Sequence, residues 1–194
     1  MHRLFLTLSR VMAILGGFVL SILILIVCLS IIGRSANSFL HTDVAQSLFP
    51  GLAQWLIDAG VGAIRGDFEL VEAGMAFSIF AFLPLTQVTV GHATVDIFTS
   101  WMPERALRIL RALIEVLFAV VLIVIAVQLF SGMQSKIRSG QTTLLLQFPV
   151  WWAYAGSVLG AGVAAVVAVY MALARVAEAT TGRSIVTDEL GAEH

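Results

Sequence analysis

VMAILGGFVLSILILIVCLSIIG, residues 11–33, is the stretch of sequence that decides the fold. It contains no charged residue and lies between Arg10 and Arg34. An apolar run of about 20 residues is long enough to cross a hydrocarbon core of about 30 Å as an α-helix. The run is too long for the apolar part of a secretory signal peptide, and no small-x-small cleavage site follows it. We therefore expect a retained membrane-spanning helix.

Three further apolar runs predict three more spanning helices. The expected spans are residues 11–33, 73–91, 112–131 and 150–174, within a single membrane domain of residues 1–194. The composition agrees, because 59% of the residues are hydrophobic and 12% are charged, roughly half the charged fraction of an ordinary globular domain. The mean hydropathy is +0.98. The sequence therefore predicts an all-α membrane protein with four transmembrane helices.

The connection between the first two spans is long and apolar. Leu48, Leu52 and Trp55 recur at helical spacing, and Pro50 is a residue that begins helices. This pattern predicts an amphipathic helix of about residues 48–63 that lies in the plane of the membrane interface. A fifth span is the alternative, but Asp58 at mid-membrane would cost about 2.5–3.5 kcal/mol.

The orientation follows from the basic residues near the ends of the spans. With four spans, both termini and the second loop share one side, which holds seven arginines: Arg3, Arg10, Arg105, Arg108, Arg111, Arg175 and Arg183. The other side holds four basic residues: Arg34, Arg65, Lys136 and Arg138. We therefore expect both termini in the cytoplasm and the first connection outside.

A helical lead-in to the third span is expected from Pro103. Four charged residues follow it on one helical face: Glu104, Arg108, Arg111 and Glu115. At the cytoplasmic interface, Arg105, Arg108 and Arg111 would either contact lipid phosphates or face a partner subunit. Both interpretations stay open from the sequence.

The fourth span contains an aromatic cluster followed by a regular series of small residues. Trp151, Trp152 and Tyr154 form a predicted interfacial aromatic belt. Small side chains then recur every four positions, at Gly156, Gly160, Ala164 and Ala168. Such a ridge would let another helix approach closely. The alternative is that the series reflects only the general abundance of Gly and Ala in membrane helices.

Several function classes are excluded or disfavoured. The net charge of −1 provides no broad basic surface for nucleic acid. The four histidines (His2, His41, His92 and His194) are scattered, and Cys28 is the only cysteine. The sequence has neither a P-loop nor a GxSxG turn. We therefore expect no catalytic, metal or substrate site, no cofactor and no ATP hydrolysis in this chain. If the chain were an enzyme, His92 and Asp96 would be the only candidate catalytic pair.

Polar residues crowd both ends of the second span. Asp67, Glu69 and Glu72 stand at its beginning, and His92 and Asp96 follow its end. The simpler interpretation is that they only limit the helix, with Gly66 and Asp67 as its start signal.

These residues also match a known pattern. Gly66-Asp67-Phe68-Glu69-Leu70-Val71-Glu72 is followed, after one span, by His92-Ala93-Thr94-Val95-Asp96, then by Pro103 with arginines, and later by Phe148-Pro149-Val150-Trp151-Trp152. The series resembles the DctQ-type small membrane subunit of tripartite ATP-independent periplasmic (TRAP) transporters, over roughly residues 66–170. Two departures are a longer first connection and Thr94, where a basic residue is common.

The resemblance implies a subunit that scaffolds a large DctM-type elevator subunit in the bacterial inner membrane, in contact with membrane lipids. Sodium would drive uptake of an organic acid delivered by a periplasmic binding protein that docks transiently. Seven residues would belong to the assembly interface: Gly66, Asp67, Glu69, Glu72, His92, Val95 and Asp96. The alternative is a structural anchor subunit of another membrane complex, which shares every feature except the motif series. A small channel is disfavoured because the spans carry few polar residues.

Overall fold

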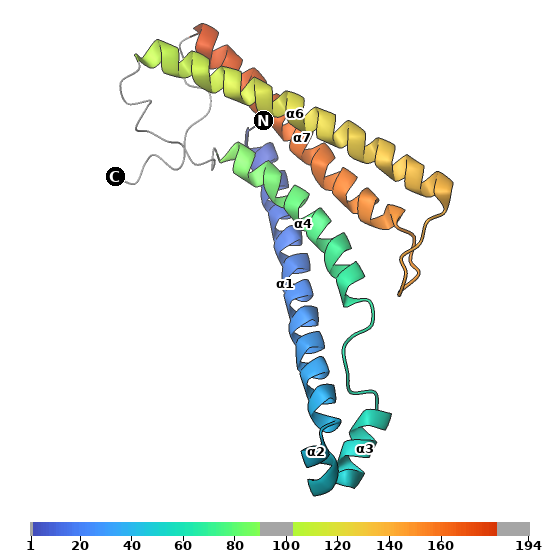
Figure 1. Ribbon diagram of the computed structural model, residues 1–194. Helices are drawn as coiled ribbons and strands as arrows, with labels where there is room; N and C mark the ends of the chain where they lie inside the picture. Colours follow the sequence, from blue (N-terminus) through green and yellow to red (C-terminus); the bar gives the residue numbers. More distant parts are fainter. Residues whose placement is uncertain (1, 90–102, 182–194) are drawn as a thin grey trace.

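A computed structural model describes residues 2–89 and 103–181 of the chain, and these parts are built of helices (Figure 1). The helices are α1 (His2–Leu40), α2 (Asp43–Leu48), α3 (Pro50–Asp58), α4 (Asp67–Val88), α6 (Glu104–Ser139) and α7 (Trp151–Thr181). Four of them, α1, α4, α6 and α7, are long and apolar enough to cross a membrane. The predicted all-α fold with four transmembrane helices is thus confirmed.

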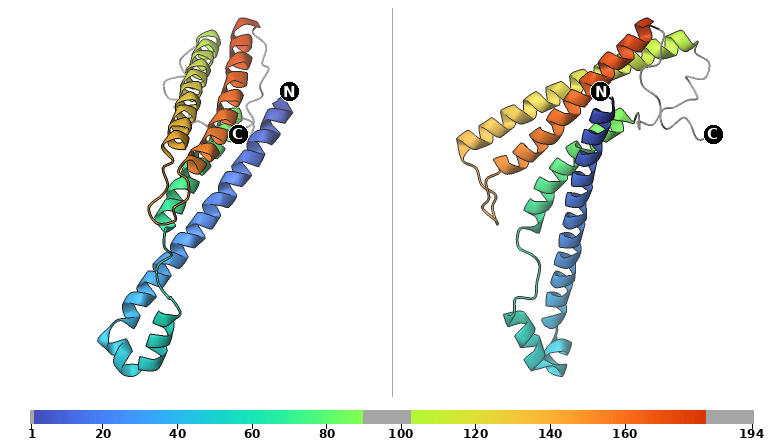
Figure 2. Two further views of the ribbon diagram at one scale, coloured as in Figure 1. Left: turned by 90° about the vertical axis from the view of Figure 1, so that its right-hand side faces the viewer. Right: turned by 180° about the vertical axis from the view of Figure 1, so that it is seen from behind.

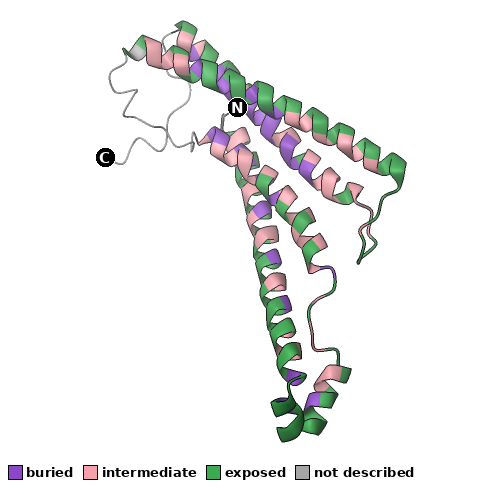
Figure 3. Cartoon of the chain, in the orientation of Figure 1, coloured by how far each residue is buried: buried purple, intermediate pink, exposed green. Residues whose placement is uncertain are grey.

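The spatial order of the spanning helices differs from their order in the chain. α1 packs along α4, α4 packs along α7, and α7 packs along α6, so that two helix pairs meet at an angle (Figures 1 and 2). In the most apolar window of α7, 56% of the residues are buried, compared with 17% in the windows of the other three spans. Figure 3 shows the same contrast between α7 and the largely exposed α1. α7 is therefore the central helix.

Small residues make the close helix contacts possible. A Cβ atom on Gly160 of α7 would lie 2.9 Å from Phe80 Cβ and 3.2 Å from the backbone nitrogen of Ala81, both on α4. On the next interface, a Cβ atom on Gly16 of α1 would lie 2.9 Å from Ala81 Cβ. The hydroxyl of Ser78 donates a hydrogen bond of 3.2 Å to the Gly16 carbonyl. α4 is thus held at close distance on both sides.

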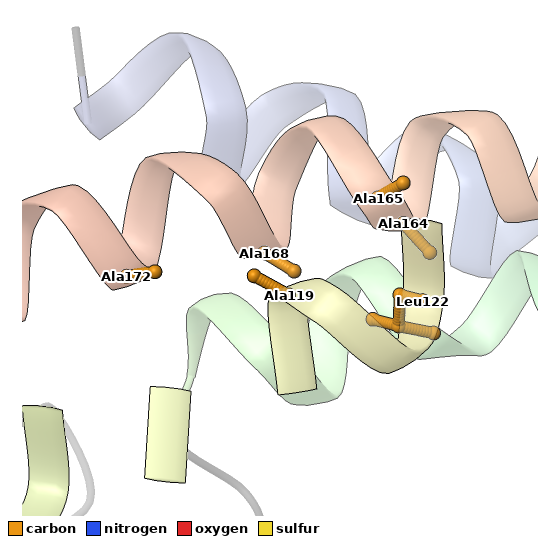
Figure 4. Close-up of a cluster of buried hydrophobic side chains, with 6 residues drawn as sticks. All are labelled: Ala119, Leu122, Ala164, Ala165, Ala168 and Ala172. Atoms are coloured by element: carbon orange, nitrogen blue, oxygen red, sulfur yellow. The ribbon is translucent and has the colours of Figure 1, made fainter. Parts of the chain in front are cut away.

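The second half of the small-residue series in α7 faces α6. Ala164 and Ala168 are fully buried and form a cluster with Ala119 and Leu122 of α6 (Figure 4). The series Gly156, Gly160, Ala164 and Ala168 therefore contacts two neighbours, α4 through its glycines and α6 through its alanines. The prediction that this ridge admits a closely packed helix is confirmed.

All four spanning helices extend beyond the predicted spans: α1 and α6 at both ends, α4 at its beginning and α7 at its end. α1 has 39 residues and is about 58 Å long at 1.5 Å per residue, whereas residues 11–33 were expected to cross the membrane. α6 begins at Glu104 with Pro103 as its N-cap, so the lead-in and the third span form one continuous helix. The predicted span limits are the ends of the apolar runs. The helices continue beyond them because backbone hydrogen bonding does not require apolar side chains.

The first connection differs from the predicted single helix of residues 48–63. It contains two short helices, α2 and α3, because Pro50 lacks the N–H that would continue α2 and instead begins α3. α3 ends at Asp58, two residues before Gly60, whose φ of +83° breaks the helix. The location of this region in the membrane interface stays a prediction.

Gly160→Ala is expected to destabilise the subunit by about 1–3 kcal/mol, because the added methyl group would push the α4 and α7 backbones apart. Gly162→Ala is the matched control on the same helix, since a Cβ there would meet nothing within 4 Å. The control should be neutral or slightly stabilising. Thermal unfolding of the detergent-purified variants measures the difference, and equal melting temperatures would contradict the close contact.

Candidate functional site

Asp67, at the beginning of α4, is bound to α1. The hydroxyl of Ser30 donates a hydrogen bond of 2.6 Å to Asp67 Oδ2, and the same hydroxyl accepts one of 3.2 Å from the backbone N–H of Ile64. Arg34 Nη2 lies 3.8 Å from Asp67 Oδ2. Ser30 is completely buried. These contacts fix the register of α1 against the start of α4.

Glu69, two residues later, holds the loop between α6 and α7. Its Oε1 accepts a 2.7 Å hydrogen bond from the backbone N–H of Leu145, and its Oε2 accepts one of 2.9 Å from that of Leu146. A carboxylate that receives two N–H groups forms strong, charge-assisted bonds. Gly66 fits beside this loop because it has no side chain: a Cβ there would lie 2.4 Å from Leu146 Cγ. The φ of Gly66, +79°, also favours glycine. The predicted start of the second span at Gly66 and Asp67 is confirmed.

The loop that Glu69 holds is itself a short hairpin. Backbone hydrogen bonds of 3.0 Å join Thr143 to Phe148 and Val150 to Gln141. The Lys136 ammonium donates a 2.6 Å hydrogen bond to Gln141 Oε1 at its base. The side chain of Leu144 at its tip is 93% exposed. The hairpin therefore presents an apolar tip at the end of the bundle where α4 begins.

A cavity of about 500 Å³ lies between α4, α6, α7 and this hairpin. Glu69 and Glu72 contribute carboxylates to its lining, and most of the remaining wall is apolar, with Ala73, Phe80 and Leu129 among its residues. Glu69 is already engaged by backbone N–H groups. Among the described residues, no group of three or more His, Cys, Asp or Glu side chains could hold a metal ion.

A second polar group lies at the opposite end of α4. The Gln87 amide of α4 donates a hydrogen bond to the Glu115 carboxylate of α6, and on α7 the Arg175 guanidinium donates one of 2.8 Å to Glu178. All four residues are at most 6% exposed. This group connects α4 to α6 and adds a buried ion pair on α7.

Glu115 corrects the predicted charged stripe on the third span. The helical spacing placed it on one outer face with Arg108 and Arg111, but it is 5% exposed and turned towards α4. Sequence reasoning also missed Gln87, Arg175 and Glu178 as interior residues. For Glu115, Arg175 and Glu178, the available signal was an ionisable residue next to apolar sequence. Ionisable side chains at membrane depth almost always face the protein interior.

The remaining predicted residues are placed as follows. Arg105 and Arg111 are exposed and Arg108 is half-buried, near the beginning of α6. The structure thus leaves their predicted lipid or partner contacts open. Three residues of the motif series, His92, Val95 and Asp96, lie outside the described residues.

The aromatic residues of the predicted belt occupy the first turn of α7. The rings of Trp151 and Trp152 meet edge to face at 6.2 Å, and Trp152 is exposed. Tyr154 is half-buried against α6, where a Cβ on Gly132 would lie 2.8 Å from its ring. Tyr154 therefore serves a helix contact as well as any contact with the interface.

Glu69→Gln should loosen the α6–α7 hairpin, because a neutral amide has one oxygen acceptor where the carboxylate has two. Hydrogen exchange at the Leu145 and Leu146 amides should become faster. Glu72→Gln is the matched control, since Glu72 is exposed and makes no hydrogen bond within the described part of the chain. Unchanged exchange in Glu69→Gln would refute the anchoring role.

Glu115→Ala should destabilise the subunit by about 1–3 kcal/mol, because it removes the buried carboxylate that accepts a hydrogen bond from the Gln87 amide. Arg105→Ala removes an exposed charge from the same helix and should change stability by no more than about 0.5 kcal/mol. Thermal unfolding of the two purified variants compares them. A Glu115→Ala protein as stable as Arg105→Ala would show that the buried bond contributes nothing.

Comparisons with known proteins agree with the motif series. The family model described as "Tripartite ATP-independent periplasmic transporters, DctQ component" matches residues 23–178. No curated protein and no solved structure matches the chain. The matched range contains the polar contacts at both ends of α4. The chain therefore belongs to the DctQ family, a family of transporter subunits and not of enzymes, and is a small membrane subunit of a TRAP transporter.

Proposed function

We propose that this chain scaffolds a large DctM-type subunit, which carries an organic acid into the cell by an elevator-like motion driven by sodium. A periplasmic binding protein delivers the solute and docks transiently. The observation that carries the proposal is the family match over residues 23–178, on a chain with four helices suited to span a membrane. Sodium and solute bind to the other subunits, and this chain holds no cofactor.

The internal contacts support a fixed frame. Asp67 is bound by Ser30, Glu69 by the hairpin amides, and Glu115 by Gln87. These polar side chains join helices of the same chain, and their bonding capacity is largely used there. A scaffold needs such joints, because a moving partner can transmit force only against helices that keep their positions. We infer that Glu69 and Glu72 serve assembly and not sodium binding, together with Gly66, Asp67, His92, Val95 and Asp96.

The topology we propose places both termini in the cytoplasm of a bacterium and the protein in its inner membrane. In support, the ring of Phe5 on α1 stacks on Tyr170 of α7 at 4.3 Å, so the start of α1 and the later part of α7 lie at the same end of the bundle. Arg105, Arg108 and Arg111 then face the cytoplasmic interface, where lipid phosphates or the partner bind them. The first connection and residues 136–147 lie outside, on the side from which the binding protein approaches.

A structural anchor for an unrelated membrane complex is the alternative function. It would use the same helices and the same polar joints. The two functions differ in the partner: a TRAP subunit requires a large permease subunit and a binding protein, and an anchor requires neither.

Cells that contain the large subunit and the binding protein should lose uptake of a labelled carboxylate, down to background, when this chain is deleted. Uptake should return when the chain is restored. Arg138→Glu, in the last turn of α6 at its proposed outer end, should reduce uptake while the purified subunit keeps its melting temperature, because Arg138 is exposed. Undiminished uptake after deletion of the chain would favour the anchor function.

A further inference from the structure

The two short helices of the first connection form an apolar projection, which we call the α2–α3 knob and define as residues 39–58. Six large apolar side chains of the knob are each more than half exposed: Phe39, Val44, Leu48, Phe49, Leu52 and Trp55. Its inward face is smaller, with Ala45 and Ala53 buried. The knob thus turns its large side chains outward.

The distance of the knob from the hydrocarbon core determines whether lipid headgroups can surround it. Ser30 of α1 is level with Asp67, the first residue of the α4 span, because their side chains share a hydrogen bond. α1 continues from Ser30 to Leu40, a rise of about 15 Å at 1.5 Å per residue. The headgroup layer outside the hydrocarbon core is only about 5–7 Å thick. An ordinary tilt of about 20° changes this rise little. The knob therefore stands beyond the lipid headgroups.

The stem beneath the knob is held straight by contacts with the returning chain. The Asn37 side-chain amide donates a 2.7 Å hydrogen bond to the Val61 carbonyl. One turn earlier, Gly33 lies so close to Gly62 that a Cβ would be 2.1 Å from its carbonyl oxygen. Figures 1 and 2 show α2 and α3 at the far end of an unbent α1. These contacts oppose a bend that would bring the knob down to the bilayer.

The charge of the knob also argues against its binding to a lipid surface. Residues 35–64 contain no Lys or Arg, and their charged residues are Asp43 and Asp58. Helices that lie on membranes usually carry basic residues that attract anionic lipids. The knob instead combines exposed aromatic and leucine side chains with two acidic residues. A protein surface with an apolar centre and a basic rim complements it.

A permanent partner fits this surface better than a transient one. Interfaces that stay closed are more hydrophobic than those that open repeatedly, and large exposed apolar patches in water favour aggregation. The knob is also continuous with an exposed apolar stripe on α1, formed by Leu25, Leu29, Ile32 and Phe39. A partner with helices beside α1 in the membrane covers both surfaces, whereas a water-soluble protein reaches only the knob.

We propose that the α2–α3 knob docks on the outward-facing surface of the large permease subunit. This inference rests on the proposed function, since it takes the partner from it. It replaces the expectation that this segment lies in the membrane interface, and it assigns the knob to the permanent subunit and not to the binding protein.

The first experiment places a photo-crosslinking amino acid at Trp55 in cells that contain the tagged large subunit and the binding protein. An adduct with the large subunit supports the proposal. Adducts with lipid, with the binding protein or with a second copy of this chain overturn it, as does the absence of any adduct. The unmodified chain must also co-purify with the large subunit; if it does not, the proposed function itself fails, so the two failures are distinguishable.

The second experiment combines Leu52→Gln with Trp55→Gln and measures recovery of the large subunit after detergent extraction. Loss of two anchoring side chains should weaken the association about tenfold or more. Leu144→Gln is the matched control, because it removes an exposed leucine outside the knob. The melting temperature of each isolated variant should stay that of the wild type, since the replaced side chains are exposed. Undiminished recovery in the double variant would overturn the proposal.

Discussion

The close approach of α7 to α4 at Gly160 is the contact on which the rest of the structure depends. α7 packs on both α4 and α6, so it connects the α1–α4 pair to the α6–α7 pair. In a membrane, water does not drive helices together, and close van der Waals packing must supply the attraction. The contact requires the absence of a side chain, because a Cβ on Gly160 would lie within 3.2 Å of the α4 backbone.

Polar contacts complete the frame at the two ends of α4. At one end, Asp67 and Glu69 bind α1 and the α6–α7 hairpin, and at the other end Gln87 binds Glu115 of α6. Because unpaired polar groups are costly in hydrocarbon, each of these bonds specifies which helices are neighbours. These contacts join α4 to α1, to the α6–α7 hairpin and to α6, which suits the scaffold role that we propose. The part of α1 beyond Ser30, the residue that binds Asp67, extends past these contacts and carries the knob at its end.

The motif residues show how far sequence patterns reach. Gly66 and Asp67 were predicted to begin the second span, and α4 begins there. Glu69 was predicted to belong to the assembly interface, which stays a prediction, and the structure adds partners that the sequence did not indicate, amides 76 and 77 residues away in the same chain. Glu115 fitted the spacing of an outer charged stripe and is nevertheless buried. Helical periodicity assigns residues to faces, and it does not say which face meets another helix.

By itself, the sequence determined the number and type of the spanning helices and, through its motif series, the family. These are local properties, because the length of an apolar run can be compared directly with the thickness of a bilayer. Only the tertiary structure decided that α7 is central, that Glu115 points inward, and that the first connection forms two helices on an extension of α1. The physical reason is that these features depend on contacts between residues far apart in the chain, which no local pattern encodes.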